Sequence, residues 1–370
     1  MTIPGPAQTV ETAGVWRTLD ASANRAAEAI RVLEDALRFM LGDAHLARLA
    51  KAIRHDLAVV LAAAEFAERI RLRDVAGDVG AGVAATRTPA RATLADLLAA
   101  NAARGTQALR SLEEFSRLVV PAATPAFEQL RYRLYILERA AVTVVVSAER
   151  LADVRLCVLL AVGSSGKGFA SQLNQLLAAG VGMIQLRDKA ASVPLLCERT
   201  RAAVAAARRQ AEASGRPRCL VIVNDRADVA VAAGADGVHL GADDLPVPLA
   251  RRVCGPRLLI GRTAHCLNEV QQAVLDGADY LGIGPCFPSA TKGFASFAPA
   301  EFLRQVAAEV NLPAFAIGGI TPDRLEQLAG LGVRRVAVSA AVTAAADPAG
   351  VVQQFNQRLK QLPHSMPAAV

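Results

Sequence analysis

Residues 220–246, LVIVNDRADVAVAAGADGVHLGADDLP, carry the pattern from which the fold is predicted. An apolar, strand-like run ends in Asn224 and Asp225, and an Ala/Val-rich helical segment follows it. A second short strand then ends in a loop that carries Asp243 and Asp244. Two successive strands therefore deliver acidic side chains just past their carboxyl ends, which is where parallel α/β barrels bind their ligands.

The rest of the second half repeats this alternation. The expected strands are 156–162, 183–186, 220–224, 237–240, 258–261, 280–284, 314–317 and 335–339. Amphipathic segments separate them, among them 193–213, 267–276, 299–309 and 323–331. Eight evenly spaced units predict a (β/α)8 TIM barrel over 153–362, with 363–370 as a tail, and they disfavour the alternative of a doubly wound open sheet.

The first part of the chain has helical periodicity throughout. We expect a flexible lead over 1–14 and an all-α domain over 15–147, with the boundary to the barrel near 147–153. An apolar stripe with spacings of three and four begins the domain, and it comprises Leu19, Ala23, Ala26, Ile30, Leu33 and Leu37. Further helices are predicted over 44–70, 94–119 and 127–146, with a loop at 119–125.

An internal repeat lies in this helical part. Residues 25–35, RAAEAIRVLED, match residues 104–114, RGTQALRSLEE, which suggests a pseudo-symmetric bundle. Its charged positions are Arg31, Glu34, Arg110 and Glu113. They form either a ligand-binding or catalytic module, or a packing and oligomerisation module with ion pairs at i,i+3 spacing. We favour the second interpretation, with homo-oligomer formation through this domain.

Composition limits the partners. The net charge of +7 and the pI near 9.4 suit anionic small molecules, because no basic block with interleaved aromatics points to nucleic acid. No apolar run reaches the roughly 18 residues that a membrane span needs, and the first residues lack a signal-peptide pattern. The six cysteines form no CxxC pair, which indicates free thiols in a reducing compartment. We expect a cytoplasmic protein that binds neither membrane nor nucleic acid.

Cations follow the second strand. Gln185, Arg187 and Lys189 alternate toward one side, so an amide and two cations can meet one anion at the barrel mouth. Asp225 and Asp244 lie on neighbouring strand ends and can share one hard cation, for which Mg²⁺ is the natural choice. The histidines lack zinc-ligand spacing, and His239 is interpreted as a packed or supporting residue.

The remaining strand ends carry groups that suit phosphate. Hydroxyls and one of only five lysines follow the fifth and sixth strands, at Thr263, Ser289, Thr291 and Lys292. Gly318 and Gly319 follow the seventh strand and Ser339 the eighth, where barrels often bind phosphate through backbone N–H groups. Lys167, in the Gly-rich loop after the first strand, is a weaker candidate because the loop fails the Walker pattern. The pattern suggests two phosphorylated substrates or one bisphosphorylated substrate.

At these residues the second half resembles the thiamine-phosphate synthase family. The matching motifs are QLRDK (185–189), NDRADVAVAAGADGVHLGADDLP (224–246), IGRTAH (260–265), DYLGIGPCFPSATK (279–292), AIGGI (316–320) and VSAA (338–341). The resemblance implies a transferase of thiamine biosynthesis. In that reaction the diphosphate of a hydroxymethyl-aminopyrimidine leaves, and the ring nitrogen of a thiazole phosphate attacks the exocyclic methylene. The products are thiamine phosphate and diphosphate.

The resemblance also implies residue roles. Asp225 and Asp244 would bind Mg²⁺, and Thr263 would lie near the leaving group. The diphosphate would be held by Arg187, Lys189, Asn224 and Lys292, while Gln185 would approach the pyrimidine. The thiazole phosphate would be held by Ser289, Thr291, Gly318, Gly319, Val338 and Ser339.

The sequence departs from the family pattern in places. Thr263 stands where Ser is usual, Ser289 where Thr is frequent, and Ala242 where Gln is common; the first strand lacks the usual Thr-Asp ending. Two rival functions are a thiazole phosphate isomerase (a tautomerase) of the same barrel family and a non-catalytic metabolite-sensing protein. The intact Arg187, Lys189, Asp225, Asp244 and Lys292 argue against the isomerase, which would not need them, and the retained metal carboxylates argue against the sensing protein.

Overall fold

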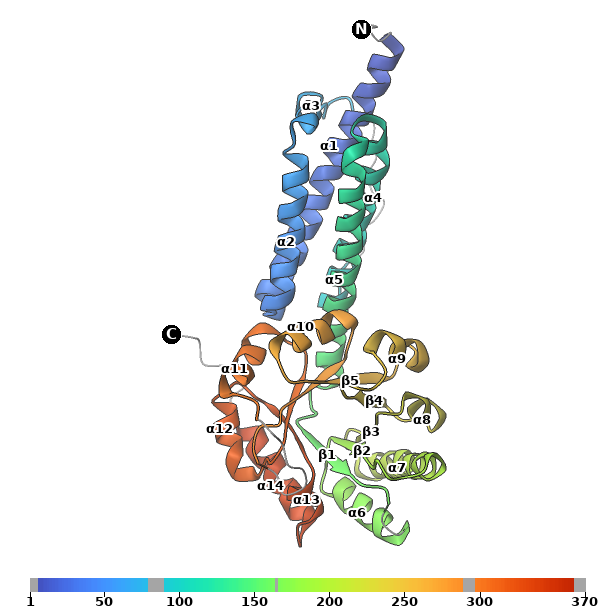
Figure 1. Ribbon diagram of the computed structural model, residues 1–370, viewed down its shortest axis with the longest axis vertical. Coiled ribbons are helices and arrows are strands. Elements are labelled where there is room, and N and C mark those ends of the chain that lie inside the picture. The colour runs from blue at the N-terminus through green and yellow to red at the C-terminus, as the bar shows by residue number, and fades with distance from the viewer. Residues whose placement is uncertain (1–5, 79–89, 164–165, 289–296, 363–370) are drawn as a thin grey trace. The chain divides into compact units, whose positions relative to one another are not determined.

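The computed structural model describes residues 6–78, 90–163, 166–288 and 297–362 (Figure 1). The chain divides into two compact units between Val145 and Val146. This division falls within helix α5 (Thr124–Arg150), next to the boundary expected near 147–153. The hydroxyl of Ser147 is buried and donates a hydrogen bond to Asp279 at 2.9 Å, so the end of α5 packs as part of the second unit.

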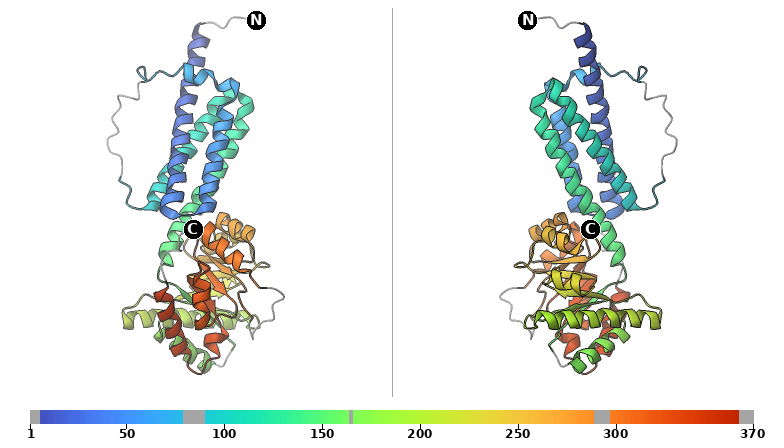
Figure 2. Two further views of the ribbon diagram at one scale, coloured as in Figure 1. Left: turned by 90° about the vertical axis from the view of Figure 1, so that its left-hand side faces the viewer. Right: turned by 90° about the vertical axis from the view of Figure 1, so that its right-hand side faces the viewer.

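Four long helices make up the first unit, and Figure 2 shows them running lengthwise beside one another. They are α1 (Pro6–Asp35), α2 (Ala44–Leu61), α4 (Leu94–Val119) and α5. A π-helical segment (Ala36–Leu41) extends α1, and short turns of helix occupy Ala64–Phe66, Glu68–Arg71 (α3) and Pro121–Ala123. The helix predicted over 94–119 is thus found with its predicted bounds.

Three local predictions are wrong. The lead expected over 1–14 is already helical from Pro6, a residue whose fixed φ suits the first turn of a helix. Helix α2 ends at Leu61 instead of 70, because Phe66 turns inward and packs edge-on against Trp16 and Phe127. Pro125, expected in a loop, lies in the first turn of α5.

The apolar stripe of α1 forms the core of the bundle. All six predicted positions are buried, and Leu19, Ala26, Ile30 and Leu37 are fully inaccessible to solvent. Gly105 of α4 allows a close approach between helices, since an added Cβ there would meet the Leu134 side chain at 2.8 Å. The same Cβ would stand 3.5 Å from the Ala29 Cβ of α1, so the two similar helices of the repeat, α1 and α4, pack against each other.

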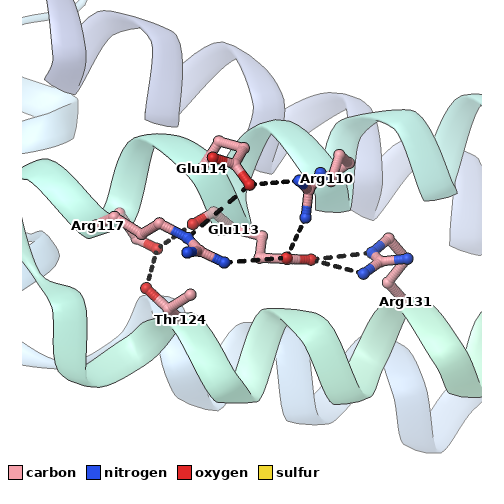
Figure 3. A network of polar contacts seen from close by, with 7 residues as sticks. Arg110, Glu113, Glu114, Arg117, Thr124 and Arg131 are labelled. Atoms are coloured by element: carbon pink, nitrogen blue, oxygen red, sulfur yellow. Dashed lines mark hydrogen bonds and ion pairs between the residues drawn. The ribbon is translucent and has the colours of Figure 1, made fainter.

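Two buried glutamates of the bundle are paired with arginines. Figure 3 shows Glu113 of α4 accepting from Arg110 and from two nitrogens of Arg131, with Arg117 nearby at 3.5 Å. Glu34, the equivalent position in the repeat, accepts from Arg54 of α2 at 2.7 Å. The predicted i,i+3 pair forms at Arg110–Glu113 but not at Arg31, which pairs with Asp35 at i,i+4 because Glu34 faces the neighbouring helix.

The second unit is a closed barrel of eight parallel strands in sequential order (Figure 1). The strands are β1 (Leu156–Leu160), β2 (Met183–Leu186), β3 (Leu220–Asn224), β4 (Gly237–Leu240), β5 (Leu259–Ala264), β6 (Tyr280–Ile283), β7 (Ala314–Ile317) and β8 (Arg335–Val338). β5 continues three residues past its predicted end, so Arg262 and Thr263 belong to the strand and pair with β6. The predicted barrel is confirmed.

Helices cover the outside of the barrel. They are α6 (Gly166–Ala178), α7 (Val193–Ser214), α8 (Ala227–Ala232), α9 (Val247–Cys254), α10 (Leu267–Asp276), α11 (Ala300–Glu309), α12 (Leu325–Ala329), α13 (Ala340–Thr343) and α14 (Pro348–Gln361). A 3-10 turn (Pro322–Arg324) precedes α12. Within the described residues, no helix is both long and apolar enough to cross a membrane.

Side chains fill the barrel interior. Met183, Ile222, Leu259, Tyr280 and Phe315 point into one buried cluster with Cys157, Leu159 and Ala337. Leu151 and Val154, which precede β1, close the amino-terminal end of this cluster. The barrel is therefore a packed core, and a ligand can enter only at an end of the strands.

Candidate functional site

The carboxyl ends of β3 and β4 bring Asp225 and Asp244 together. Asn224 pairs with His239 across the two strands, and the next residue, Asp225, donates its backbone N–H to the His239 carbonyl at 2.8 Å. Asp225 has a φ of +64°, an uncommon conformation for a residue with a side chain. Asp244 is fixed by a turn in which its carboxylate accepts from the Gly241 N–H at 2.6 Å.

The two carboxyl groups interact directly and repel each other when both are charged. Burial, the contact with Asp244 and the charge of Asp244 raise the pKa of Asp225 to about 6. Lys189 and Arg187 lower it, so both cations act on this carboxylate. The neighbourhood that the sequence predicted, two carboxylates facing two cations, is thus present at one end of the barrel.

This pair fits a hard divalent cation. Mg²⁺ takes one or two protein carboxylates and completes its shell with water and phosphate oxygens, and a cation between two facing carboxylates would remove their repulsion. Among the described residues, no group of three His, Cys, Asp or Glu side chains gathers into a fuller ligand cage. The two carboxylates therefore suit Mg²⁺ bound together with a phosphate-bearing ligand.

A chain of hydrogen bonds forms the polar floor beneath these charges. The His239 ring bonds to the Thr263 hydroxyl at 2.9 Å and to the Tyr280 hydroxyl at 3.2 Å, and Tyr280 also bonds to Gln185. All four residues line a small cavity of about 30 Å³ at the top of the barrel core. Burial lowers the pKa of His239 to about 4, so the ring is neutral at physiological pH.

Two strand glycines make room for this floor. An added Cβ at Gly261 would stand 2.1 Å from the Tyr280 ring, and one at Gly282 would stand 3.0 Å from the His239 ring. The sequence predicts His239 as a packed or supporting residue and does not single out Tyr280. The glycines opposite them on β5 and β6 are a signal that could have identified both, because a glycine within a strand often marks the close approach of another group.

Asp188 is a further residue that the sequence interpretation passed over. Its carboxylate accepts from the Gly163 N–H at 2.7 Å and from the Ala190 N–H at 3.0 Å. It therefore ties the loop after β1 to the loop that carries Arg187 and Lys189. Its place between those two cations in the motif gave no indication of this connection.

Gly318, Gly319, Val338 and Ser339 lie at the ends of β7 and β8, which are neighbours in the barrel. Gly318 and Gly319 have φ values of +102° and +60°, and an added Cβ at Gly319 would stand 2.2 Å from the Pro288 carbonyl oxygen. The Val338 side chain is buried, so only its backbone faces a ligand. The Ser339 hydroxyl donates to the Leu159 carbonyl at 3.3 Å.

Some predicted residues lie outside the described part of the chain. They are Ser289, Thr291 and Lys292 in the loop after β6, together with residues 164–165 and the side chain of Lys167. Asp243 is described and exposed, whereas Asp244 is half-buried. Asp244, the expected metal ligand, is therefore the less exposed of the two neighbouring aspartates.

Comparison with known proteins covers both units. Residues 156–342 match the thiamine monophosphate synthase family, and residues 17–140 match the ThiD2 family. The chain is similar to a thiamine-phosphate synthase of Rhodopirellula baltica, with 40% identity over 343 residues, 90% of this chain and 89% of that protein. A thiamine-phosphate synthase of Gloeobacter violaceus is 40% identical over 353 residues, 95% of this chain and 99% of that protein.

A solved structure is similar to the barrel. It is a thiamine phosphate pyrophosphorylase from Pyrococcus furiosus, with 30% sequence identity and a TM-score of 0.50, and it aligns 57% of this chain with 97% of that one. The sequence similarity extends over both units. The structural similarity is to the barrel, whose fold is already established by its eight strands. The chain therefore belongs to the thiamine-phosphate synthase family.

Proposed function

We propose that this chain condenses hydroxymethyl-aminopyrimidine diphosphate with hydroxyethylthiazole phosphate. The thiazole nitrogen gives its electron pair to the exocyclic methylene carbon, and the bond from that carbon to the diphosphate oxygen breaks. The bonding pair leaves on the oxygen, which gives thiamine phosphate and diphosphate. The observation that carries the proposal is the pair Asp225 and Asp244 facing Arg187 and Lys189, since a leaving diphosphate needs both kinds of partner.

The charged rim stabilises the leaving group. Asp225 and Asp244 would hold Mg²⁺, which when bound offsets the charge of the diphosphate oxygens. Arg187 and Lys189 bind the same oxygens, and Asn224 at the end of β3 adds an amide donor. Lys292 has the same role by resemblance to the family. This chemistry depends on positioning and charge stabilisation, and it requires no general base.

The floor of the site orients the pyrimidine. Gln185 and Thr263 are fixed by Tyr280 and His239 respectively, so their polar groups are held in place before substrate binds. A neutral His239 can serve either as donor or as acceptor to Thr263. The resulting hydrogen-bond pattern supports recognition of a flat heterocycle above the barrel core, with Thr263 close to the leaving group.

The β7–β8 side receives the second substrate. Gly318 and Gly319 at the end of β7 have positive φ and pack closely against residues 285–288, and we assign their backbone N–H groups to the phosphate of this substrate. Gly318, Gly319, Val338 and Ser339 are assigned to the thiazole phosphate, with Ser289 and Thr291 added by resemblance. Two anion sites at different strand ends match two phosphorylated substrates that meet over the centre of the barrel.

For the helical unit we propose a scaffold and association role. Glu34 and Glu113 are buried and engaged by arginines from neighbouring helices, which is the arrangement of structural ion pairs. On α5, Tyr132, Tyr135 and Ile136 are exposed and offer a surface for a second copy of the chain. A mass measurement by light scattering tests this: a monomer for the full chain at micromolar concentration would remove the association role.

The catalytic proposal is tested by product analysis. Purified protein is incubated with both substrates and Mg²⁺, and diphosphate and thiamine phosphate are quantified, with single-substrate and chelator controls. We expect the two products in equal amounts, and neither when a substrate or Mg²⁺ is omitted. Absence of diphosphate release would refute the synthase assignment, and conversion of the thiazole phosphate alone would indicate the isomerase.

A further inference from the structure

A second cavity lies at the opposite, amino-terminal face of the barrel. It has a volume of about 520 Å³, within the range typical of small-molecule sites. Its walls come from the residues just before β1, β2 and β3 and from the carboxyl-terminal ends of α6, α7 and α14. Figure 1 shows α6, α7 and α14 in the part of the barrel that contains β1 and β2. None of the residues proposed for catalysis lines it.

The floor of this cavity is apolar and its rim is basic. Leu156, Leu177, Val181, Ala207 and Ala211 supply carbon surface. The charged groups in the lining are Arg155, Arg216, Lys360 and Asp153, three cations against one carboxylate. An apolar floor with several cations at one side is complementary to a small molecule that has an apolar body and an anionic group.

The cations are held at the cavity by the fold. Arg155 donates to the Leu359 carbonyl at 2.7 Å, which anchors its guanidinium between β1 and α14. Arg216 lies over the turn at Gly180, where an added Cβ would stand 3.4 Å from its Nη1 atom. In the described part of the chain, neither Arg216 nor Lys360 has a carboxylate within ion-pair distance. An incoming anion would therefore meet Arg216 and Lys360 without competition from a described carboxylate.

Two neighbouring arginines add to the positive potential. Arg335 donates to the carbonyls of Val154 and Leu151, and Arg334 to those of Ala329 and Val333. Burial lowers the pKa of both Arg334 and Arg335, and the charge of Arg155 lowers each further. The cations at this face repel one another, and a bound anion would reduce that repulsion.

We propose that this amino-terminal cavity is a second ligand site, which binds a phosphate ester with an apolar body through Arg155, Arg216 and Lys360. Guanidinium and ammonium groups together suit the three oxygens of a phosphate monoester. The aromatic or aliphatic part of the ligand lies against Leu177 and Val181. The site is independent of the proposed reaction, because it lies at the other end of the strands.

The test uses the full chain with phenyl phosphate as the probe. Methyl groups of Leu177, Val181 and Leu359 report the amino-terminal cavity by NMR, while those of Ile283 and Ile317 report the carboxyl face. We expect saturable shifts at the first set, with at least fivefold weaker binding of inorganic phosphate, which lacks the apolar body, and of phenol, which lacks the charge.

Charge reversal provides the matched comparison. The double variant Arg216→Glu, Lys360→Glu should weaken the phenyl phosphate shifts at Leu177 and Val181 at least tenfold. Arg208→Glu, Arg209→Glu makes the same change of charge on the exposed side of α7, outside the cavity, and should alter binding less than twofold. Shifts confined to Ile283 and Ile317, or shifts at Leu177 that survive the first double variant, would overturn the proposal.

Discussion

Asp225 combines two unfavourable features at one residue. Its positive φ costs on the order of 1–3 kcal/mol for a residue that is not glycine, and its carboxyl group faces that of Asp244. The Arg226 N–H returns to the Asn224 carbonyl at 2.8 Å, so the chain makes a tight turn at Asp225. Such a conformation directs the side chain toward the mouth of the barrel, and a metal ion bound with diphosphate would compensate for both features.

The first prediction concerns this carboxylate. Asp225→Asn should lower kcat by about 100-fold or more, the size of effect typical for loss of one group that stabilises a leaving charge, and circular dichroism should show an unchanged fold. Asp243→Asn makes the same chemical change two residues after Gly241 on an exposed side chain and should leave kcat within about twofold. Comparable losses in the two variants would contradict the assigned roles.

His239 gives a prediction about pH. Burial depresses the pKa of the folded state to about 4 from an ordinary 6.5, so the unfolded chain binds more protons between these values. The contribution of His239 to stability is therefore complete above pH 6.5 and is lost as the pH falls toward 4. Between pH 7 and pH 4.5 the resulting loss in the free energy of unfolding is about 2–3 kcal/mol.

The measurement is urea unfolding of the wild-type chain and of His239→Gln at both pH values. On acidification, the free energy of unfolding of the wild type should fall by about 2–3 kcal/mol more than that of the variant. An equal loss in both proteins would mean that His239 titrates normally in the folded state.

At the scale of elements, the barrel was predictable and the bundle only in part. Strands β2, β3, β4 and β7 have the predicted bounds, because each is a short apolar run between polar turns. β5 extends further because Thr263 pairs with Gly282 and bonds to His239, which are contacts between distant residues. The break in α2 after Leu61 likewise depends on tertiary packing of Phe66, for which local periodicity gives no signal.

The same distinction applies to the site. The order of motifs along the barrel fixes which strand ends carry Asp225, Asp244, Arg187 and Gln185, because consecutive strands are neighbours in a (β/α)8 barrel. The hydrogen bonds that run from Gln185 through Tyr280 and His239 to Thr263 arise only from three-dimensional packing. The link from Asp188 to the loop after β1 joins residues 25 apart in sequence and is of the same kind.

The ion pairs between helices give the next prediction. Glu113→Gln should destabilise the helical unit by about 3 kcal/mol, since it removes the counter-charge of the buried Arg131. Glu114→Gln is the control, because Glu114 is 45% exposed and pairs with the exposed Arg110; its cost should stay below about 0.5 kcal/mol. Thermal unfolding followed by helical circular dichroism distinguishes the two, and equal costs would contradict a structural role for Glu113.

At the scale of the whole molecule, the two units have separate cores and separate family matches. A chain that begins at Val146 keeps Ser147, whose hydroxyl satisfies the buried Asp279. Asp279 also accepts from Arg251 and from the Ile260 N–H, so it joins α9 to β5. A barrel chain that lacks Ser147 would leave this network incomplete.

The chain from Val146 to the carboxyl terminus should therefore fold and retain turnover within about threefold of the full protein if the helical unit is a scaffold. Steady-state assays at matched protein concentration, with light scattering to record association, test this. A folded but inactive barrel would assign the helical unit a direct part in the reaction.

The proposed metal site, with Asp225 and Asp244 holding a metal ion opposite Arg187 and Lys189, can be observed by anomalous diffraction. Crystals are soaked with Mn²⁺ and diphosphate, and Mn²⁺ takes the place of Mg²⁺. We predict an anomalous peak bound by both carboxylates, with diphosphate oxygens between the metal and the two cations. A metal peak elsewhere, or diphosphate bound without contact to Arg187 and Lys189, would contradict the claim.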